Sequence, residues 1–310
     1  MVCFSLLAGA CSVKTVETKC DRKCLIGLMD QYLAALVKHD PSGIPLAANV
    51  QFVENTERTQ IGKGLWQTAS AGPKDFKIYV PDPVDGQIGF LGVIREQNHP
   101  AMLGARLKLV DGKITQIDHL VYHDVKEPLS QTLITPRPGI LQPLAPSEKV
   151  SREQMLKAAN SYYEAIVQDN GKVAPFADEC QRRENGGTSA NDQTQTADEA
   201  AKDDFSVFRK MTCSDQLSTG VMSYITDINR RRLLAVDEEN GLVFAYSIFV
   251  HDGEPKVMKI IGVPGITTRE NKYGAFDLPA CHIFKIRNGK LYEIEAMGYM
   301  AKHGIKNGWE

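Results

Sequence analysis

The sequence predicts an α+β chain of two tandem cone-shaped domains, each a curved antiparallel sheet packed on helices. Three internal echoes support this prediction. The aligned segments are 30–55 with 160–185 at an offset of 130, 82–86 with 237–241 at an offset of 155, and 108–114 with 285–291 at an offset of 177. Because their order is preserved and the offset only grows, the chain holds two copies of one domain, the second enlarged by insertions.

Length, composition and charge exclude several classes of protein. The 310 residues suit two domains of about 150 residues each. A hydrophobic content of 43% with 24% charged residues is typical of a globular protein with a substantial core. The net charge of −2 gives no basic face, so we expect a small-molecule partner and no nucleic acid.

Residues 1–19 are predicted to be an export leader and tether. The apolar run from Phe4 ends in small residues before Cys11, and it resembles the end of a bacterial lipoprotein signal. This resemblance implies export to the periplasm, or an outer-membrane lipoprotein with a lipid anchor at Cys11. The alternative is a frayed apolar terminus.

Five cysteines remain beyond the leader. In an oxidising compartment we favour a Cys180–Cys213 disulfide, which would tie the first strand of domain 2 to the far side of a polar insertion. Cys20 and Cys24 could bridge locally, and Cys281 is expected to be a small buried hydrophobe. A second Cys pair at ligand spacing is missing, so no metal site is predicted.

The first cone domain is predicted over residues 20–123. A 3.6-residue apolar stripe predicts a helix over 21–39, which Asp40 to Gly43 would end. The remaining predicted elements are a strand at 50–54, a short helix or turn within 61–70, a hairpin of 76–80 with 88–95, and a second hairpin of 101–110 with 114–123. Asp111-Gly112 is the strongest hairpin dipeptide in the chain.

Residues 124–149 contain five prolines and no periodicity, and we interpret them as a linker. The second cone domain is predicted over residues 150–310. Its expected elements are a helix at 151–168, a strand at 180–184, a hairpin of 231–237 with 242–251, and another of 280–286 with 290–299. The polar insertion 186–204 cannot bury an apolar face and is expected to be a mobile loop. A second insertion falls between residues 253 and 278.

Two resemblances follow from these segments. Pro175-Phe-Ala-Asp-Glu179 leading to Glu184-Asn185 resembles the acidic strand end of SnoaL-like and ketosteroid-isomerase-like cone proteins, the nuclear-transport-factor-2 superfamily. The segments 20–24, 39–41, 183–186 and 236–244 resemble a group of double-domain secreted proteins of fungi and bacteria. The resemblance implies a pocket inside each cone and chemistry without a cofactor.

Strand alternation selects the first candidate residues. Glu54 shares a strand face with Phe52, and Glu184 shares one with Arg182, so each carboxylate would enter a cone. A carboxylate in an apolar pocket can act as a general acid or base near neutral pH, and an interior arginine needs a carboxylate or a ligand oxygen as a partner. The alternative is structural: Glu54-Asn55 and Glu184-Asn185 would cap turns.

The last strand of each copy supplies further candidates. Asp118 and Glu295 occupy equivalent positions, and Tyr299 lies on the same face as Glu295, which suits binding of a phenol or stabilisation of an oxyanion. A solvated face is the alternative. His119 could pair with Glu54 as an acid–base dyad, whereas His119 and His123 stand about 13 Å apart on a strand and cannot share a metal ion. The candidate substrate contacts are Asn185, Tyr246, Trp66 and Asp118.

The leading hypothesis is a cofactor-independent acid–base enzyme that acts on a small aromatic or polyketide-like molecule. Its specific form is hydrolytic or eliminative cleavage of a lignin-type aryl ether, in which Glu184 activates water or removes a proton, Arg182 steadies an oxyanion and Tyr299 protonates the phenoxide. The alternatives are an isomerase or dehydratase of the same fold, or a non-catalytic ligand-binding protein. A homodimer, or a chain that mimics a dimer by packing its two sheets together, is compatible with each.

Overall fold

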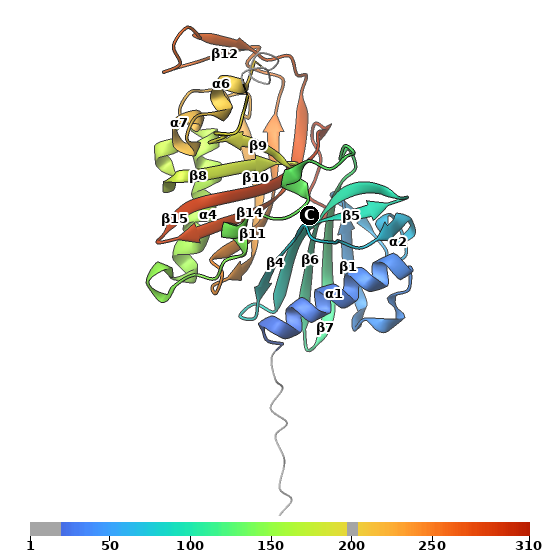
Figure 1. Cartoon of the computed structure of the whole chain (residues 1–310). Coiled ribbons are helices and arrows are strands. Elements are labelled where there is room, and N and C mark those ends of the chain that lie inside the picture. Colours follow the sequence, from blue (N-terminus) through green and yellow to red (C-terminus); the bar gives the residue numbers. More distant parts are fainter. Residues whose placement is uncertain (1–19, 197–203) are drawn as a thin grey trace, which may run out of the picture.

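The computed structural model describes residues 20–196 and 204–310 and contains two seven-stranded sheets, one in each half of the chain (Figure 1). Domain 1 comprises α1 (Arg22–Lys38), η1 (Pro41–Gly43), β1 (Leu46–Glu54), β2 (Glu57–Thr59), α2 (Leu65–Thr68), β3 (Ala69–Ala71), β4 (Lys77–Asp82), β5 (Gln87–Glu96), β6 (His99–Val110) and β7 (Lys113–Tyr122). Domain 2 comprises α4 (Arg152–Val167), η4 (Gly171–Val173), β8 (Phe176–Glu184), β9 (Gly187–Ala190), α6 (Ser206–Arg209), α7 (Cys213–Leu217), β10 (Asp227–Asp237), β11 (Leu242–His251), β12 (Val257–Lys259), β13 (Thr268–Glu270), β14 (Phe276–Arg287), β15 (Lys290–Gly298) and β16 (Ala301–Lys302). The predicted leader and Cys11 lie outside the described residues.

The strand registers confirm the duplication. Phe90 pairs with Ala105 in domain 1, and Ala245 pairs with His282 in domain 2. These four residues are related by the offsets of 155 and 177 seen in the sequence. The offsets therefore identify equivalent positions in the two domains residue by residue.

The sheets are mixed, and the prediction of purely antiparallel sheets was wrong. β1 runs parallel to β7, and β8 runs parallel to β15. Each of these first strands reaches the last strand of its own domain after the whole domain has intervened, so a tight hairpin does not dictate its direction. The remaining pairs in the two large sheets are antiparallel, as expected from their hairpins.

The two long helices begin and end as their sequences predict. Asp21 caps α1 by accepting a hydrogen bond from the Cys24 amide at 2.8 Å, and Ser151 caps α4 through a capping box. α1 ends at His39 in the left-handed region. One face of each helix packs on its own sheet, which forms one hydrophobic core per domain.

A third core joins the domains, because the two sheets also pack against each other. Two glycines of domain 1 permit this approach. A Cβ on Gly89 would clash with the Phe244 ring, and one on Gly104 would clash with Cys281. Phe244 and Cys281 are the equivalents of these same glycines at offsets of 155 and 177. Residues near a two-fold axis face their own equivalents, so the contact has the form of a dimer interface with a small residue opposite each larger one.

Two reciprocal ion pairs show the same pseudo-symmetry. Arg22 at the start of α1 contacts Asp237 at 2.5 Å, and Arg152 at the start of α4 contacts Asp82 at 3.0 Å. The arginines are equivalent at offset 130 and the aspartates at offset 155. Reciprocal exchange of this kind is the signature of an isologous interface, so the chain folds as a mimic of a dimer.

Two predictions about irregular segments need correction. The linker is docked through η2 (Gln131–Leu133), α3 (Pro138–Leu141) and η3 (Pro146–Glu148), because Leu133 and Ile140 are buried in the core between the sheets. The polar insertion is not wholly a loop. β9 pairs with β8, which satisfies its backbone, and residues 197–203 lie outside the described residues.

Both predicted disulfides are present, Cys20–Cys24 and Cys180–Cys213, and Cys281 is free and buried. Two disulfides favour an oxidising compartment. Among the helices of the described residues, none has the length and apolarity needed to cross a bilayer.

Candidate functional site

In domain 1, four predicted or neighbouring side chains form one hydrogen-bonded chain. Glu54 lies opposite His119 in the β1–β7 register, and its Oε2 is 3.0 Å from His119 Nδ1. His119 Nε2 is 2.8 Å from the Tyr32 hydroxyl, to which Trp66 Nε1 donates at 3.3 Å. The expected Glu54–His119 pair is therefore confirmed as a contact.

This series of hydrogen bonds ends in contacts with other protein atoms on both sides. Glu54 also accepts a hydrogen bond from the Leu65 amide at 3.0 Å, and a side chain on Gly64 would clash with its carboxylate. Tyr32 and Trp66 are buried, and burial holds the pKa of Tyr32 well above its usual value. Every polar group in the chain is satisfied by protein, which is the arrangement expected of a filled core.

In domain 2 the equivalent carboxylate, Glu184, meets a different partner. Arg182 occupies the position of Phe52, and Ala296 occupies that of His119. Arg182 Nε lies 2.8 Å from Glu184 Oε1, so the predicted pair is in contact. The guanidinium also donates to the Ser189 hydroxyl at 3.0 Å and to Gln216 Oε1 at 2.6 Å.

The Arg182 centre is only partly satisfied. Arg182 is 1% exposed, yet its Nη1 has no hydrogen-bond partner among the described residues. The Glu184 side chain is 43% exposed, so this end of the centre reaches the surface. Burial raises the pKa of Tyr162 and of Tyr224, which both interact electrostatically with Glu184 and Arg182 and are protonated at neutral pH.

The structure separates Tyr299 from this centre, so the expected cooperation of Tyr299 with Glu184 was wrong. Glu184 lies opposite Ala296 and shares its face of the sheet, whereas Tyr299 projects from the other face. Its hydroxyl donates to the Asn55 carbonyl of domain 1 at 3.4 Å. Burial, with Glu57 and Glu54 nearby, raises the pKa of Tyr299 to about 12.

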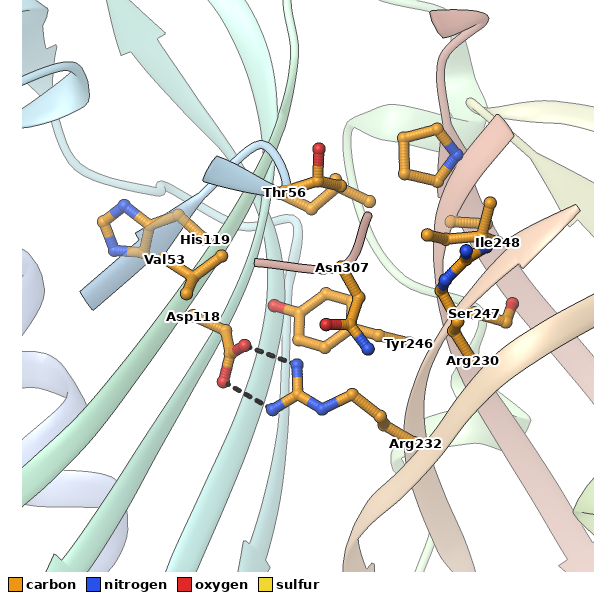
Figure 2. A pocket seen from close by; sticks show the side chains of 13 residues that line it. Val53, Thr56, Asp118, His119, Arg230, Arg232, Tyr246, Ser247, Ile248 and Asn307 are labelled. Atoms are coloured by element: carbon orange, nitrogen blue, oxygen red, sulfur yellow. Dashed lines mark hydrogen bonds and ion pairs between the residues drawn. The ribbon is translucent and has the colours of Figure 1, made fainter. Parts of the chain in front are cut away.

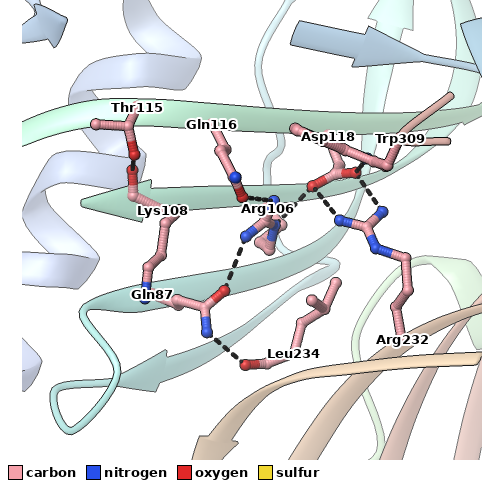
Figure 3. Close-up of polar contacts among 9 residues, drawn as sticks. All are labelled: Gln87, Arg106, Lys108, Thr115, Gln116, Asp118, Arg232, Leu234 and Trp309. Atoms are coloured by element: carbon pink, nitrogen blue, oxygen red, sulfur yellow. Dashed lines mark hydrogen bonds and ion pairs between the residues drawn. The ribbon is translucent and has the colours of Figure 1, made fainter. Parts of the chain in front are cut away.

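Asp118 lies between the domains rather than in a cone or in solvent (Figure 3). It accepts hydrogen bonds from Arg106 Nε and Arg232 Nη1, both at 2.6 Å, and from Trp309 Nε1 at 2.5 Å. Burial alone would raise the pKa of Asp118, but the two guanidiniums outweigh it and hold the pKa below its usual value. Asp118 is thus part of a structural network of hydrogen bonds and ion pairs between the domains.

A pocket of about 30 Å³ adjoins this network, lined by Asp118 of domain 1 and by Arg232 and Tyr246 of domain 2 (Figure 2). The ring of His119 points away from it. That volume holds a water molecule or two and not an aromatic substrate. Tyr246 is therefore an interface residue in this structure.

Asn185 and Asn55 have structural roles, as the alternative interpretation had it. Both adopt positive φ, 48° and 49°. The Asn185 side chain exchanges two hydrogen bonds with the backbone of Gly298, at 2.9 and 3.0 Å, and Asn55 Oδ1 accepts one from the Val121 amide at 2.8 Å. The Asn185 side chain therefore stabilises a turn that joins two strands, and its contact with substrate stays a prediction.

Glu295 is buried on the face between the domains, beside Arg137 of the linker at 3.2 Å. Burial, only partly offset by Arg137 and Arg183, raises the pKa of Glu295 to about 7. A raised carboxyl pKa stabilises the fold below the unfolded-state pKa, and this contribution disappears as the pH rises through the folded-state pKa.

We therefore expect the free energy of unfolding to fall by up to roughly 3 kcal/mol between pH 4.5 and 7 because of Glu295. Urea unfolding at several pH values should show that Glu295→Gln removes this slope. Glu239→Gln serves as a control, because that side chain is 57% exposed. An unchanged slope in Glu295→Gln would assign it to other groups.

Sequence reasoning missed His282. Ala105 lies opposite His119 in domain 1, and His282 lies opposite Ala296 in domain 2, so the imidazole has moved to the neighbouring strand. The offset of 177 aligns Ala105 with His282 and His119 with Ala296, so the sequence alone could have shown this exchange. Tyr162, Tyr224 and Gln216 were missed as well, and Tyr224 and Gln216 have no internal echo because they lie between the segments that match at offsets of 130 and 155.

Parts of the chain are similar to a family model and to several solved structures. Residues 148–298 match a family model described as "Domain of unknown function (DUF8021)". No curated protein matches. Among solved structures, putative polyketide cyclases from Silicibacter sp. TM1040 (13% identity, TM-score 0.28, covering 49% of this chain and 91% of that one) and from Xanthomonas campestris pv. campestris (14%, 0.28, 47% and 90%) are similar, as is a putative hydroxylase from Streptomyces galilaeus (10%, 0.27, 48% and 81%).

Proposed function

We propose that domain 2 carries a cofactor-independent acid–base site for a small oxygen-bearing molecule, centred on Glu184 and Arg182. The observation that carries the proposal is the buried Arg182 guanidinium, whose Nη1 lacks a partner among the described residues beside a half-exposed carboxylate. A buried cation with an unused donor is costly unless a ligand oxygen completes its hydrogen bonds. Domain 1 offers no such donor in its Glu54–His119–Tyr32 chain.

The chemical roles follow from charge and position. Glu184 is the general base, because it is an acceptor at the exposed end of the centre. Arg182 stabilises developing negative charge on a substrate oxygen, since its Glu184 partner keeps it charged despite burial. Tyr162 or Tyr224, both protonated, replaces Tyr299 as the donor to a leaving oxygen.

The specific reaction proposed is cleavage of an aryl ether C–O bond in a phenolic substrate. In the hydrolytic form, Glu184 takes a proton from water, the hydroxide attacks carbon, and the departing phenoxide is steadied by Arg182 and protonated by a tyrosine. In the eliminative form, Glu184 takes a proton from carbon and the phenoxide leaves. Incubation with β-aryl ether dimers in ¹⁸O-labelled water distinguishes the two, because only hydrolysis leaves label in the non-phenolic fragment.

Glu184→Gln is expected to lower turnover by a factor of about 10²–10⁴ without unfolding the protein, because it removes the base and leaves an amide that can still face Arg182. Turnover is measured by mass spectrometry, and folding by near-UV circular dichroism. Glu179→Gln is the matched control, since Glu179 lies on the same strand with 64% of its side chain exposed.

Loss of turnover in Glu54→Gln, with Glu184→Gln fully active, would place the site in domain 1. If no ether, ketone or polyketide-like substrate turns over but ligands bind in an Arg182-dependent way, domain 2 is a binding module and the enzymatic proposal fails.

A further inference from the structure

Three further polar side chains meet inside domain 2: Tyr163 of α4, Ser247 of β11 and His282 of β14. The Tyr163 and His282 rings lie edge to face with centroids 5.4 Å apart, and Ser247 is close enough to lower the pKa of Tyr163. Ser247 alternates with Tyr246 along β11, so it faces the domain 2 core while Tyr246 faces domain 1.

All three side chains are buried, and apart from the polar contact between Tyr163 and Ser247 they face apolar and aromatic groups. Tyr163 is 0% exposed, and Ser247 and His282 are each 2% exposed. The Tyr163 hydroxyl, the Ser247 hydroxyl and His282 Nδ1 have no hydrogen bond within the described residues. Each unsatisfied buried group costs about 1–3 kcal/mol, and the contact between Tyr163 and Ser247 leaves all three groups short of a well-formed hydrogen bond, so the cluster requires an explanation.

Domain 1 shows that the fold does not need these groups. The equivalent positions are Leu33, Gly92 and Ala105, at offsets of 130, 155 and 177, and all three are apolar. Gly92 pairs with Leu103 in domain 1 as Ser247 pairs with Ala280 in domain 2, which confirms the alignment. Domain 2 thus carries polar groups at three neighbouring positions where its twin has an apolar core.

The surroundings of the trio are aromatic and neutral. Phe249 and Phe284 stack on His282 with centroids 5.6 and 5.5 Å away, and Tyr162 lies 5.6 Å from it. Burial, with Arg182 nearby, lowers the pKa of His282 to about 3, and burial raises the pKa of Tyr163, so both are uncharged at neutral pH. The trio therefore offers neutral donors and acceptors, unlike the charged Arg182 end.

We infer that Tyr163, Ser247 and His282 form the inner, neutral end of the domain 2 site and recognise a hydroxyl or carbonyl group on an aromatic ligand. The inference rests on the proposed function, because it takes Arg182 to hold the acidic oxygen of the same ligand. A ligand with an anionic group at one end of a planar body and a phenol at the other matches both ends. An ordered water bridging the trio is the competing occupant.

Isothermal titration with three probes tests this inference: 4-hydroxycinnamate, 4-methoxycinnamate and cinnamate. We expect wild-type protein to bind 4-hydroxycinnamate at least about tenfold more tightly than cinnamate. A ligand that lacks the hydroxyl leaves the buried polar groups of the site without a hydrogen-bond partner. Tyr163→Phe and Ser247→Ala should bring that ratio close to 1 with little change in the affinity for cinnamate. Tyr273→Phe, which alters an exposed tyrosine, should leave the ratio intact.

The remaining outcomes separate this inference from the proposed function. Equal binding of the three probes, absence of binding, or an unchanged ratio in Tyr163→Phe and Ser247→Ala would mean that the trio holds an ordered water only, and would overturn the inference. Even then, loss of turnover in Glu184→Gln would support the proposed enzymatic function. Conversely, a hydroxyl preference that depends on Tyr163 and Arg182, with Glu184→Gln fully active, would uphold the inference and remove the acid–base role.

Discussion

Asp118→Ala is expected to lower the free energy of unfolding by about 3–5 kcal/mol, which is the usual consequence of removing one member of a buried ion pair. Asp118 is 2% exposed and joins Arg106 of domain 1 to Arg232 of domain 2. Arg106, also 2% exposed, would keep only the side-chain oxygens of Gln87 and Gln116 as acceptors. A buried guanidinium without a counter-ion is the main cost.

The two tryptophans locate the effect. Trp309 lies between the domains and Trp66 lies in the domain 1 core, so variants with a single tryptophan report on each region separately. In Asp118→Ala, the Trp309 emission should shift to the red at a lower urea concentration than the Trp66 emission. Glu127→Ala is the matched control: this surface carboxylate is 49% exposed, and its loss should cost at most about 1 kcal/mol. Coincident transitions at the wild-type midpoint would show that Asp118 does not hold the domains together.

Much of the fold could be predicted because the sequence contains two copies of the same domain, which can be compared with each other. The offsets of 130, 155 and 177 survive as strand registers, and the Asp111-Gly112 and Asn288-Gly289 turns have the positive φ values expected of a two-residue hairpin loop. Alternation along a strand correctly placed Glu54 with Phe52 and Glu184 with Arg182. The Cys180–Cys213 pairing also followed from the position of the insertion.

The sequence did not predict which part of the protein covers each face of the two sheets. Alternation put Asp118 and Glu295 on one face of their strands, but a period of two does not say whether that face meets solvent, a cone or a second sheet. The answer lies in residues far away in sequence: Trp309 reaches Asp118 and Arg137 reaches Glu295. Tyr299 was misassigned for the same reason, since its partner belongs to the other domain.

The two copies have also diverged in a way that a comparison of separate motifs cannot detect. In domain 1 an imidazole on β7 completes a closed chain with Glu54 and Tyr32. In domain 2 that imidazole stands across the strand pair at His282, and Arg182 has taken the place beside the carboxylate. Only the paired strands considered together show that the positions of histidine and alanine have been exchanged.

His282 should make domain 2 sensitive to acid. Burial in the domain 2 core is the largest cause of the shift in the His282 pKa, and Arg182 is the second. Both lower the pKa and so favour the neutral ring. Its folded-state pKa of about 3 lies below the ordinary value of 6.5, so the stability it contributes is present above pH 6.5 and is lost as the pH falls towards 3. The integrated effect is roughly 5 kcal/mol over this window.

His282→Phe should therefore remove most of the loss of stability between pH 6.5 and 3, because Phe cannot be protonated in the unfolded chain and its ring can retain the stacking on Phe249 and Phe284. The measurement is urea unfolding at half-unit pH steps, followed by far-UV circular dichroism. His99→Gln controls for the loss of a histidine at an exposed position. Acid sensitivity that persists unchanged in His282→Phe would assign it to other groups such as Asp118, and would mean that folding does not lower the pKa of His282.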